Sequence, residues 1–164
     1  MNKRINARGF LLSLLLSMAV TISGMAASAS PSVADLLARS GLSFSPVKGR
    51  TDSWSITYSG LNNLEELWVY VLAHEANYVT VYTTVFSIKG NPPKAFLWRL
   101  LTRNDEMLPF KYVIREDPDH KGTYLVDCQA DLLLKSITAD ELLAILNRFV
   151  LIVDEDYPEL KDLL

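Results

Sequence analysis

Two stretches in the middle of the chain alternate in the way that is typical of β-strands. Residues 65–74 and 78–89 are dense in Val, Tyr, Thr, Trp and Phe, which are enriched in strands. If Glu75, Ala76 and Asn77 form a three-residue turn with Asn77 left-handed, His74 pairs with Tyr78 and residues of equal parity share a face. A four-residue turn would mix the two sets. The first register gives an aliphatic face of Leu67, Val69, Val71, Ala73, Val79, Val81 and Val85, and an aromatic face of Trp68, Tyr70, Leu72, Tyr78, Thr80, Tyr82 and Phe86.

Weaker patterns predict the elements around this hairpin. A short helix begins after Ser32 and ends at Gly41, a loop covers residues 43–52, and a strand covers residues 53–59. Asn91 is the expected cap of a second helix that runs to residue 103 with Leu97, Leu100 and Leu101 on one side, widened by Phe96 and Trp98. A second hairpin joins residues 109–116 to residues 123–131.

The last helix has the clearest pattern. Thr138 with Glu141 three residues later has the capping-box spacing, and the apolar residues then recur at steps of three and four: Leu142, Ile145, Leu146, Phe149, Ile152 and Val153. We expect this helix to pack on the sheet, with a second subunit as a further candidate partner. The whole order predicts an α+β fold, in which an antiparallel sheet of about five strands carries helices on one face in the order α-β-β-β-α-β-β-α.

The N-terminus has the pattern of a cleavable signal peptide. Lys3, Arg4 and Arg8 precede an apolar run at residues 10–22, which is shorter than the roughly twenty residues that a membrane span needs. Ala27-Ser28-Ala29 is a small-x-small cleavage site. We therefore predict a signal peptide at residues 1–29, one domain at residues 30–164, a periplasmic or secreted location, and no permanent membrane span.

Charge and side-chain chemistry exclude several function classes. After cleavage, thirteen basic and nineteen acidic residues leave a net charge of −6, which disfavours nucleic acid and anionic membranes as partners. The single cysteine, Cys128, has the parity of a buried strand residue and forms no internal disulfide. His74 and His120 are expected in turns without clustered ligands, so no metal or other cofactor is predicted.

No catalytic motif is present, and the chain is not expected to be an enzyme. An enzyme with an unrecognised site and a structural subunit of an envelope complex stay as alternatives. Arg99 and Arg103, four residues apart on the second helix, are interpreted as a solvated polar face, with docking of a carboxylate-bearing partner as the alternative.

The second half of the chain carries a family resemblance. Residues 96–104 (FLWRLLTRN), 107–110 (MLPF), 123–130, 134–141 and 153–160 (VDEDYPEL) resemble the YbjN family of bacterial domains, which is similar in fold to the class I chaperones of type III secretion. The resemblance implies a frequently homodimeric binding module without cofactor or chemistry, and fold alone assigns no function. Two departures argue against a secretion-chaperone role: this chain is predicted to be exported, and only Asp154, Glu155, Asp156 and Glu159 match the acidic helix ends of such chaperones.

The aromatic face is the strongest candidate for a binding surface. Its side chains would expose more apolar area than a monomer usually leaves uncovered. Other parts of the chain, a second copy or a peptide client are the three candidate covers. The sequence hypothesis is an exported, non-catalytic protein-binding or chaperone-like domain, expected to be homodimeric, with a candidate interaction surface of Trp68, Tyr70, Tyr78, Tyr82, Phe86 and Phe149.

Overall fold

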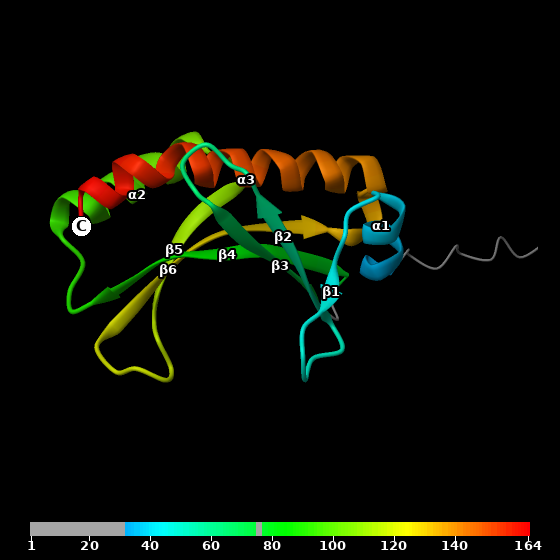
Figure 1. Cartoon of the computed structure of the whole chain (residues 1–164), viewed down its shortest axis with the longest axis horizontal. Helices are drawn as coiled ribbons and strands as arrows, with labels where there is room; N and C mark the ends of the chain where they lie inside the picture. Colours follow the sequence, from blue (N-terminus) through cyan, green and yellow to red (C-terminus); the bar gives the residue numbers. More distant parts are fainter. Residues whose placement is uncertain (1–31, 75–76) are drawn as a thin grey trace, which may run out of the picture.

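The computed structural model describes residues 32–74 and 77–164. In these residues, the strands are β1 (Ser45–Pro46), β2 (Ser53–Ser59), β3 (Glu66–His74), β4 (Tyr78–Lys89), β5 (Phe110–Glu116) and β6 (Thr123–Leu133). The helices are α1 (Val33–Arg39), α2 (Lys94–Glu106) and α3 (Ala139–Asp162), with the short 3-10 helix η1 (Leu134–Ser136) before α3. The strands form one antiparallel sheet in the order β1-β2-β3-β4-β6-β5; α2 and α3 lie over one of its faces, and α1 packs against α3 at the end of the sheet (Figure 1). The predicted α+β fold is confirmed, and β1 is a two-residue addition inside the predicted loop.

Local capping chemistry fixes where two of the helices begin. The Ser32 side chain accepts a hydrogen bond from the Asp35 N–H and so caps α1. At α3, Thr138 and Glu141 form the predicted capping box, in which each side chain binds the other residue's backbone N–H. The predicted cap of α2 was wrong: Pro93 occupies that position with an extended backbone and makes no side-chain bond.

The core lies between the sheet and the helices. Val69, Val71, Val79 and Val81 are fully or almost fully buried on the helix side of the central hairpin, together with Leu142 and Leu146 of α3. The predicted register is confirmed, since His74 pairs with Tyr78 and Asn77 has a φ of 58°. Cys128 is buried as predicted, and burial raises the pKa of its thiol.

A β-bulge corrects one part of the predicted faces. Strand β4 shifts register against β6 between Thr84 and Phe86, so the residues after the bulge change sides. Phe86 therefore belongs to the core, where it is 9% exposed and stacks on Tyr157 of α3 with ring centroids 5.4 Å apart. Its assignment to the aromatic face was wrong.

Phe149 is the second correction to the candidate interaction surface. It is 0% exposed, and its ring packs 5.7 Å from that of Phe110 under α3. The helical spacing correctly placed Phe149 on the apolar side of α3, but that side faces the sheet. The residue has no surface to offer a partner.

Helix α2 buries less of its apolar surface than its sequence predicted. Phe96 and Leu100 are buried, whereas Trp98 is 73% exposed and Leu101 is 61% exposed. Because α2 packs along the outer strand β5, only one side of the helix is covered. Trp98 and Leu101 lie on the uncovered side.

Arg99 and Arg103 do not form a solvated face, because α3 supplies their carboxylate partners. Arg99 binds Glu159 at 2.7 Å, and Arg103 binds the buried Asp156 through two nitrogens at 2.8 and 2.9 Å. The Asp156 hydrogen bond is the largest cause that raises the pKa of Arg103. The two arginines thus hold α2 against α3 within one chain.

A second acidic residue of α3 holds the loop before β3. Asp154 is 2% exposed, and its carboxylate accepts backbone N–H bonds from Asn62, Asn63 and Leu64 at 2.9 to 3.0 Å. The Asn63 side chain also donates to the Asp154 carbonyl. The loop between β2 and β3, which includes Leu64, is therefore docked on the helix just before β3 begins at Glu66.

The predicted signal peptide lies outside the described residues. Within residues 32–74 and 77–164, no helix has the length and apolar character that crossing a bilayer requires.

Candidate functional site

Four of the six predicted surface residues lie together on the face of the sheet that the helices leave uncovered. We call this surface, made of Trp68, Tyr70, Tyr78 and Tyr82, the aromatic face. Trp68 is 50% exposed, and the three tyrosines are half-buried. Tyr70 and Tyr82 stack across β3 and β4 with ring centroids 5.3 Å apart.

Tyr78 extends the row toward the hairpin turn. Its ring stacks on the imidazole of His74 at 4.1 Å with an interplanar angle of 13°. His74 is the last residue of β3, as the predicted strand bounds gave it, so it lies beside the hairpin turn and not within it. The aromatic face therefore runs along the central hairpin from Trp68 to Tyr78, as a strip of rings rather than a single patch.

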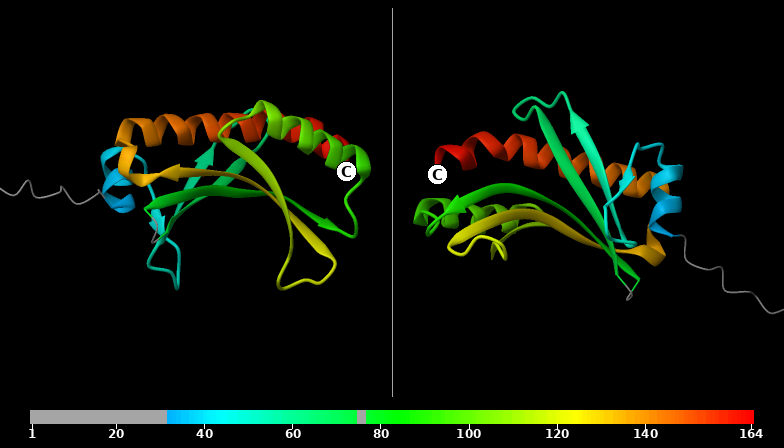
Figure 2. Two further views of the ribbon diagram at one scale, coloured as in Figure 1. Left: turned by 180° about the vertical axis from the view of Figure 1, so that it is seen from behind. Right: turned by 60° about the horizontal axis from the view of Figure 1, so that its bottom comes forward.

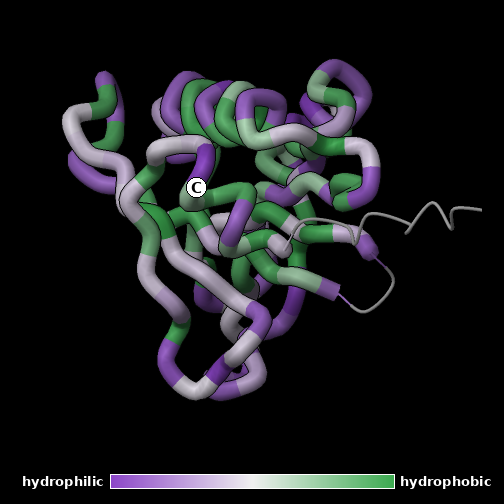
Figure 3. Tube along the Cα trace, turned by 90° about the vertical axis from the view of Figure 1, so that its right-hand side faces the viewer, coloured by the Kyte–Doolittle hydropathy of each residue, from purple (hydrophilic) through white to green (hydrophobic). Residues whose placement is uncertain are grey.

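Two loops flank this uncovered side of the sheet. The segments at residues 47–52 and 117–122 both project away from the helices, at opposite sides of the sheet (Figures 1 and 2). Figure 3 shows that the loops at this end are coloured mainly as hydrophilic. The strip of rings thus lies between two polar projections, a shape suited to a chain that crosses the sheet.

Charged groups surround the centre of the strip. Burial is the largest influence on Tyr82 and raises its pKa, while the nearby cations Arg50 and Arg115 act in the opposite direction. Arg115 also binds Asp127 at 2.6 Å, and the Thr84 hydroxyl donates to the same carboxylate at 2.6 Å. These contacts satisfy Asp127, which is almost fully buried.

A row of hydrogen-bonded side chains crosses the same face near the hairpin turn. Lys111 binds Asp131 at 2.9 Å, the Thr80 hydroxyl donates to Asp131 at 2.7 Å, and the Nε2 of His74 lies 2.9 Å from the Thr80 oxygen. Partial burial acts to raise the pKa of Asp131, but the bonds from Lys111 and Thr80 outweigh it and lower the pKa.

The hydrogen bonds that join His74, Thr80 and Asp131 do not have the order that activates a catalytic nucleophile. In a Ser-His-Asp triad, histidine accepts the proton of the hydroxyl and the carboxylate orients the histidine. Here the Thr80 proton goes to Asp131, so the nitrogen of His74 that faces Thr80 is a donor rather than a base. The arrangement explains a stable polar surface and provides no activated nucleophile.

Metal-binding chemistry has no candidate in the part of the chain that the structure describes. There, no group of three or more histidine, cysteine, aspartate and glutamate residues is arranged to hold an ion. The His120 side chain is exposed and pairs with the Asp117 carboxylate at 3.0 Å in the hairpin loop. This pair, together with the Asp119 N–H that Asp117 accepts, is turn chemistry of the kind the sequence suggested.

Comparisons with known proteins show the fold. No family model matches the sequence, and no curated protein matches it. Among solved structures, the chain is similar to YbjN from E. coli, described as a proposed transcription regulator, with 13% identity, a TM-score of 0.51 and coverage of 76% of this chain and 87% of that one. The resemblance to YbjN predicted from the sequence is confirmed as a likeness of fold.

A second solved structure with a similar arrangement is a type III secretion chaperone. It is SycH from Yersinia pestis, in complex with a stable fragment of YscM2. The identity is 12%, the TM-score is 0.49, and the match covers 76% of this chain and 95% of that chain.

Proposed function

We propose that this chain is an exported, non-catalytic domain that binds other polypeptides in an extended conformation, in the manner of a chaperone or adaptor. The observation that carries the proposal is the aromatic face, where a half-exposed tryptophan and three tyrosines lie in a row on a sheet surface that the helices of the described residues leave uncovered. Aromatic rings supply large contact areas with little loss of side-chain entropy, and they are enriched at protein interfaces. The two projecting loops confine a bound chain to the same strip.

The chemistry around the strip supports binding rather than catalysis. The one thiol, Cys128, is fully buried, and the hydroxyl of Thr80 is committed to a carboxylate. The charged groups Lys111, Asp131, Arg115 and Asp127 are paired with one another. A surface of satisfied polar groups interleaved with exposed rings fits a polypeptide that presents both backbone and side chains.

Export is the second part of the proposal, and the N-terminal sequence supports it. The basic start, the apolar run of residues 10–22 and the Ala27-Ser28-Ala29 site together favour cleavage after Ala29. The protein recovered from the periplasmic or culture fraction should begin at Ser30, which N-terminal sequencing or intact mass tests. Recovery of the uncleaved chain in the cytoplasmic fraction alone would contradict export.

Homodimer formation is the third part, and α2 and β5 are the surface that favours it. Trp98 and Leu101 are the most exposed large apolar residues of α2, and a pocket of about 320 Å³ lies between this helix and β5. The outer edge of β5 is partly closed within the chain, because the Asn104 side chain of α2 accepts from the Tyr112 N–H and donates to the Tyr112 carbonyl. The proposed contact is therefore between apolar side chains: a two-fold axis beside α2 would bring Trp98 and Leu101 of the two copies together and cover them.

Light scattering tests the dimer. The purified protein should have twice the monomer mass at micromolar concentration, and Leu101→Glu should reduce it to the monomer mass. Leu151→Glu, a matched change at an exposed position of α3, should leave the dimer intact. A wild-type monomer at high micromolar concentration contradicts the dimer and leaves polypeptide binding to be tested separately.

Photocross-linking tests polypeptide binding in the cell. A benzoylphenylalanine in place of Tyr82 reports from the aromatic face, whereas one in place of Asn147 reports from the exposed side of α3. Adducts with other polypeptides should form at Tyr82 and not at Asn147. Equal adducts at both positions, or none at Tyr82, would contradict the assigned face.

A further inference from the structure

The central sheet opens between β3 and β4. Their ladder runs from His74–Tyr78 to Tyr70–Tyr82 and stops there, although β3 stays paired with β2 as far as Glu66 and β4 stays paired with β6 as far as Lys89. The right-hand view of Figure 2 shows β2 and β3 diverging from β4 and β6. The facing edges of residues 66–69 and 83–86 are therefore not paired with each other.

Two local features account for the opening. The bulge after Thr84 adds a residue to β4 and turns the strand away. At the end of the ladder, the Thr83 hydroxyl donates to the Trp68 carbonyl at 2.7 Å. A side chain thus occupies one backbone acceptor of β3 where a strand neighbour would otherwise donate.

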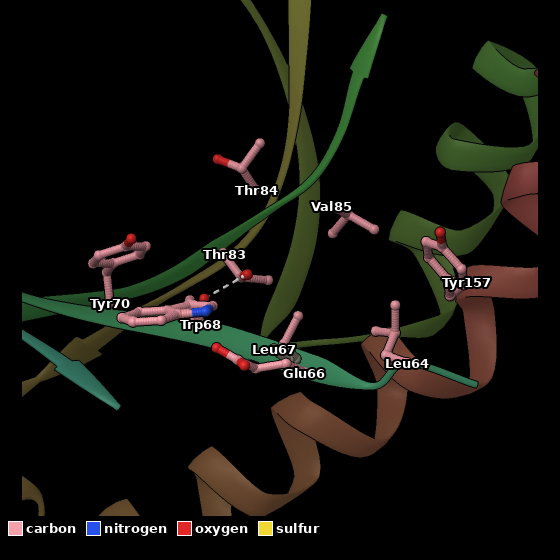
Figure 4. A pocket seen from close by; sticks show the side chains of 9 residues that line it. All are labelled: Leu64, Glu66, Leu67, Trp68, Tyr70, Thr83, Thr84, Val85 and Tyr157. Carbon is pink, nitrogen blue, oxygen red and sulfur yellow. Dashed lines mark hydrogen bonds between the residues drawn. The ribbon is translucent and has the colours of Figure 1, made fainter. Parts of the chain in front are cut away.

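The opening contains a pocket of about 360 Å³. Trp68 and Tyr70 lie at the end toward the aromatic face, while Leu64, Val85 and Tyr157 lie at the end toward α3 (Figure 4). At about 30 Å³ for each water molecule, this is room for roughly twelve waters, and so for one large side chain.

Among the described residues that line the pocket, Glu66 is the one with a charged side chain. Glu66 and Trp68 have the same parity on β3 and are both exposed, so the carboxylate and the indole lie on the same side of the strand. A cation held there would meet both a negative charge and an aromatic ring. The net charge of −6 for residues 30–164 favours a basic partner as well.

We propose that the opening binds an extended segment of another polypeptide as an added strand along the free edge of β3. The proposal rests on the polypeptide-binding function above and names where the segment sits and what it carries. One large apolar side chain enters the pocket between Leu67, Val85 and Tyr157. The residues before and after it point to the other side, where a lysine or arginine meets Glu66 and Trp68.

The unpaired strand edge is the reason for choosing a polypeptide. Backbone N–H and C=O groups seek partners, and an extended chain supplies them at the spacing of a strand while its alternate side chains fill pockets. A compact small molecule could fill the pocket but would leave the backbone groups of the β3 edge without hydrogen-bond partners. The occupant should therefore need its own backbone N–H groups for binding.

Three seven-residue peptides test this with the protein purified from cells that express the full chain. The first is acetyl-Thr-Val-Lys-Leu-Lys-Val-Thr-amide, the second replaces both lysines by glutamate, and the third is the first with N-methylated lysine backbones. The lysine peptide should bind at least tenfold more tightly than each of the others. Amide hydrogen exchange followed by NMR should slow within residues 66–69, on the free edge of β3.

Substitutions connect the binding to the residues of the opening. Trp68→Ala should weaken binding of the lysine peptide at least fivefold, whereas Leu151→Ala, a truncation of a large apolar side chain at an exposed position of α3, should leave it unchanged. Glu66→Lys should reverse the preference between the lysine and glutamate peptides. Both positions are exposed, so the variants are expected to fold.

Four results overturn the proposal: no binding of the lysine peptide, equal binding of the lysine and glutamate peptides, equal binding of the N-methylated peptide, or protection confined to other elements. Equal binding of the N-methylated peptide would identify a side-chain pocket without strand pairing. If the peptide fails while Tyr82 still cross-links to other polypeptides, the opening is not the site and the proposed function stands. If both fail, the proposed function falls too.

Discussion

Replacing Asp154 by asparagine should destabilise the whole domain, although the change is nearly isosteric. The Asp154 carboxylate accepts three backbone N–H bonds, from Asn62 to one oxygen and from Asn63 and Leu64 to the other. An asparagine retains one acceptor oxygen for two of these bonds, without the charge. Its amide nitrogen then faces the third N–H, so two donors meet.

The cost can be worked from these contacts. A hydrogen bond to a charged group is worth about 1.5–3 kcal/mol, against about 1 kcal/mol for a neutral one, and an unsatisfied buried donor costs about 1–3 kcal/mol. Because the three bonds share one carboxylate, their losses do not simply add. We expect Asp154→Asn to lower the free energy of unfolding by about 3 kcal/mol, which for a domain of this size lowers the Tm by about 10 °C.

Urea denaturation followed by circular dichroism measures the effect. The midpoint should fall while the slope with denaturant stays the same, because the surface exposed on unfolding is unchanged. Glu155→Gln is the matched control: the neighbouring residue is exposed, and the same change of charge there should alter stability by less than about 0.5 kcal/mol. Equal midpoints for the two variants would refute the role given to Asp154.

Three further predictions concern buried groups. Burial raises the pKa of Tyr58 to about 12, so the folded state keeps this proton at pH values where the unfolded chain loses it. The free energy of unfolding should therefore fall from about pH 10 to pH 12. Urea titrations over this range should show a smaller fall for Tyr58→Phe. Cys128 is fully buried with a raised thiol pKa, so a thiol reagent at pH 8 should modify it only in denaturant, and rapid native labelling would contradict its burial. Arg103→Leu should lower the free energy of unfolding by about 3 kcal/mol in thermal unfolding, because it leaves the buried Asp156 without its ion pair. Arg99→Leu, at the more exposed pair with Glu159, should lower it by less than about 1 kcal/mol. Equal losses for the two variants would contradict this difference.

The sequence predicted most of the fold because its local signals were strong. The capping box at Thr138 and the register that pairs His74 with Tyr78 both follow from residues close together in the chain, and both are confirmed. Alternation placed Cys128 inward for the same reason. Patterns of period two and of three to four report which side of an element is buried whenever the element is regular.

The candidate site was predicted only in part because it depends on irregular and long-range features. The bulge after Thr84 turns Phe86 from the uncovered face to the core. No residue type in the alternating run predicts that a bulge occurs there. Phe149 had the right helical spacing, but spacing alone does not say whether the apolar stripe meets a sheet or a partner.

Two groups of functional interest had no strong signal in the sequence. Tyr157 reaches the opening from α3, more than seventy residues after Val85 on the other wall. Arg50 lies near Tyr82, in a segment for which the sequence predicted only a loop. Pairings over such separations are set by how elements pack, which periodicity does not encode. One signal for the α2–α3 ion pairs was present, the opposite charges of VDEDYPEL and FLWRLLTRN, but the interpretation of Arg99 and Arg103 as a solvated face did not use it.

The central claim is that the aromatic face binds extended polypeptides, and an NMR titration with a permanently unfolded protein tests it most directly. Reduced and carboxamidomethylated ribonuclease A is a suitable probe because it is basic and cannot refold. The account predicts that backbone amide signals of Trp68, Tyr70 and Tyr82 shift on addition of the probe, and that Tyr82→Asp abolishes the shifts while Asn147→Asp does not. Shifts confined to the helices, or none at millimolar probe, would contradict it.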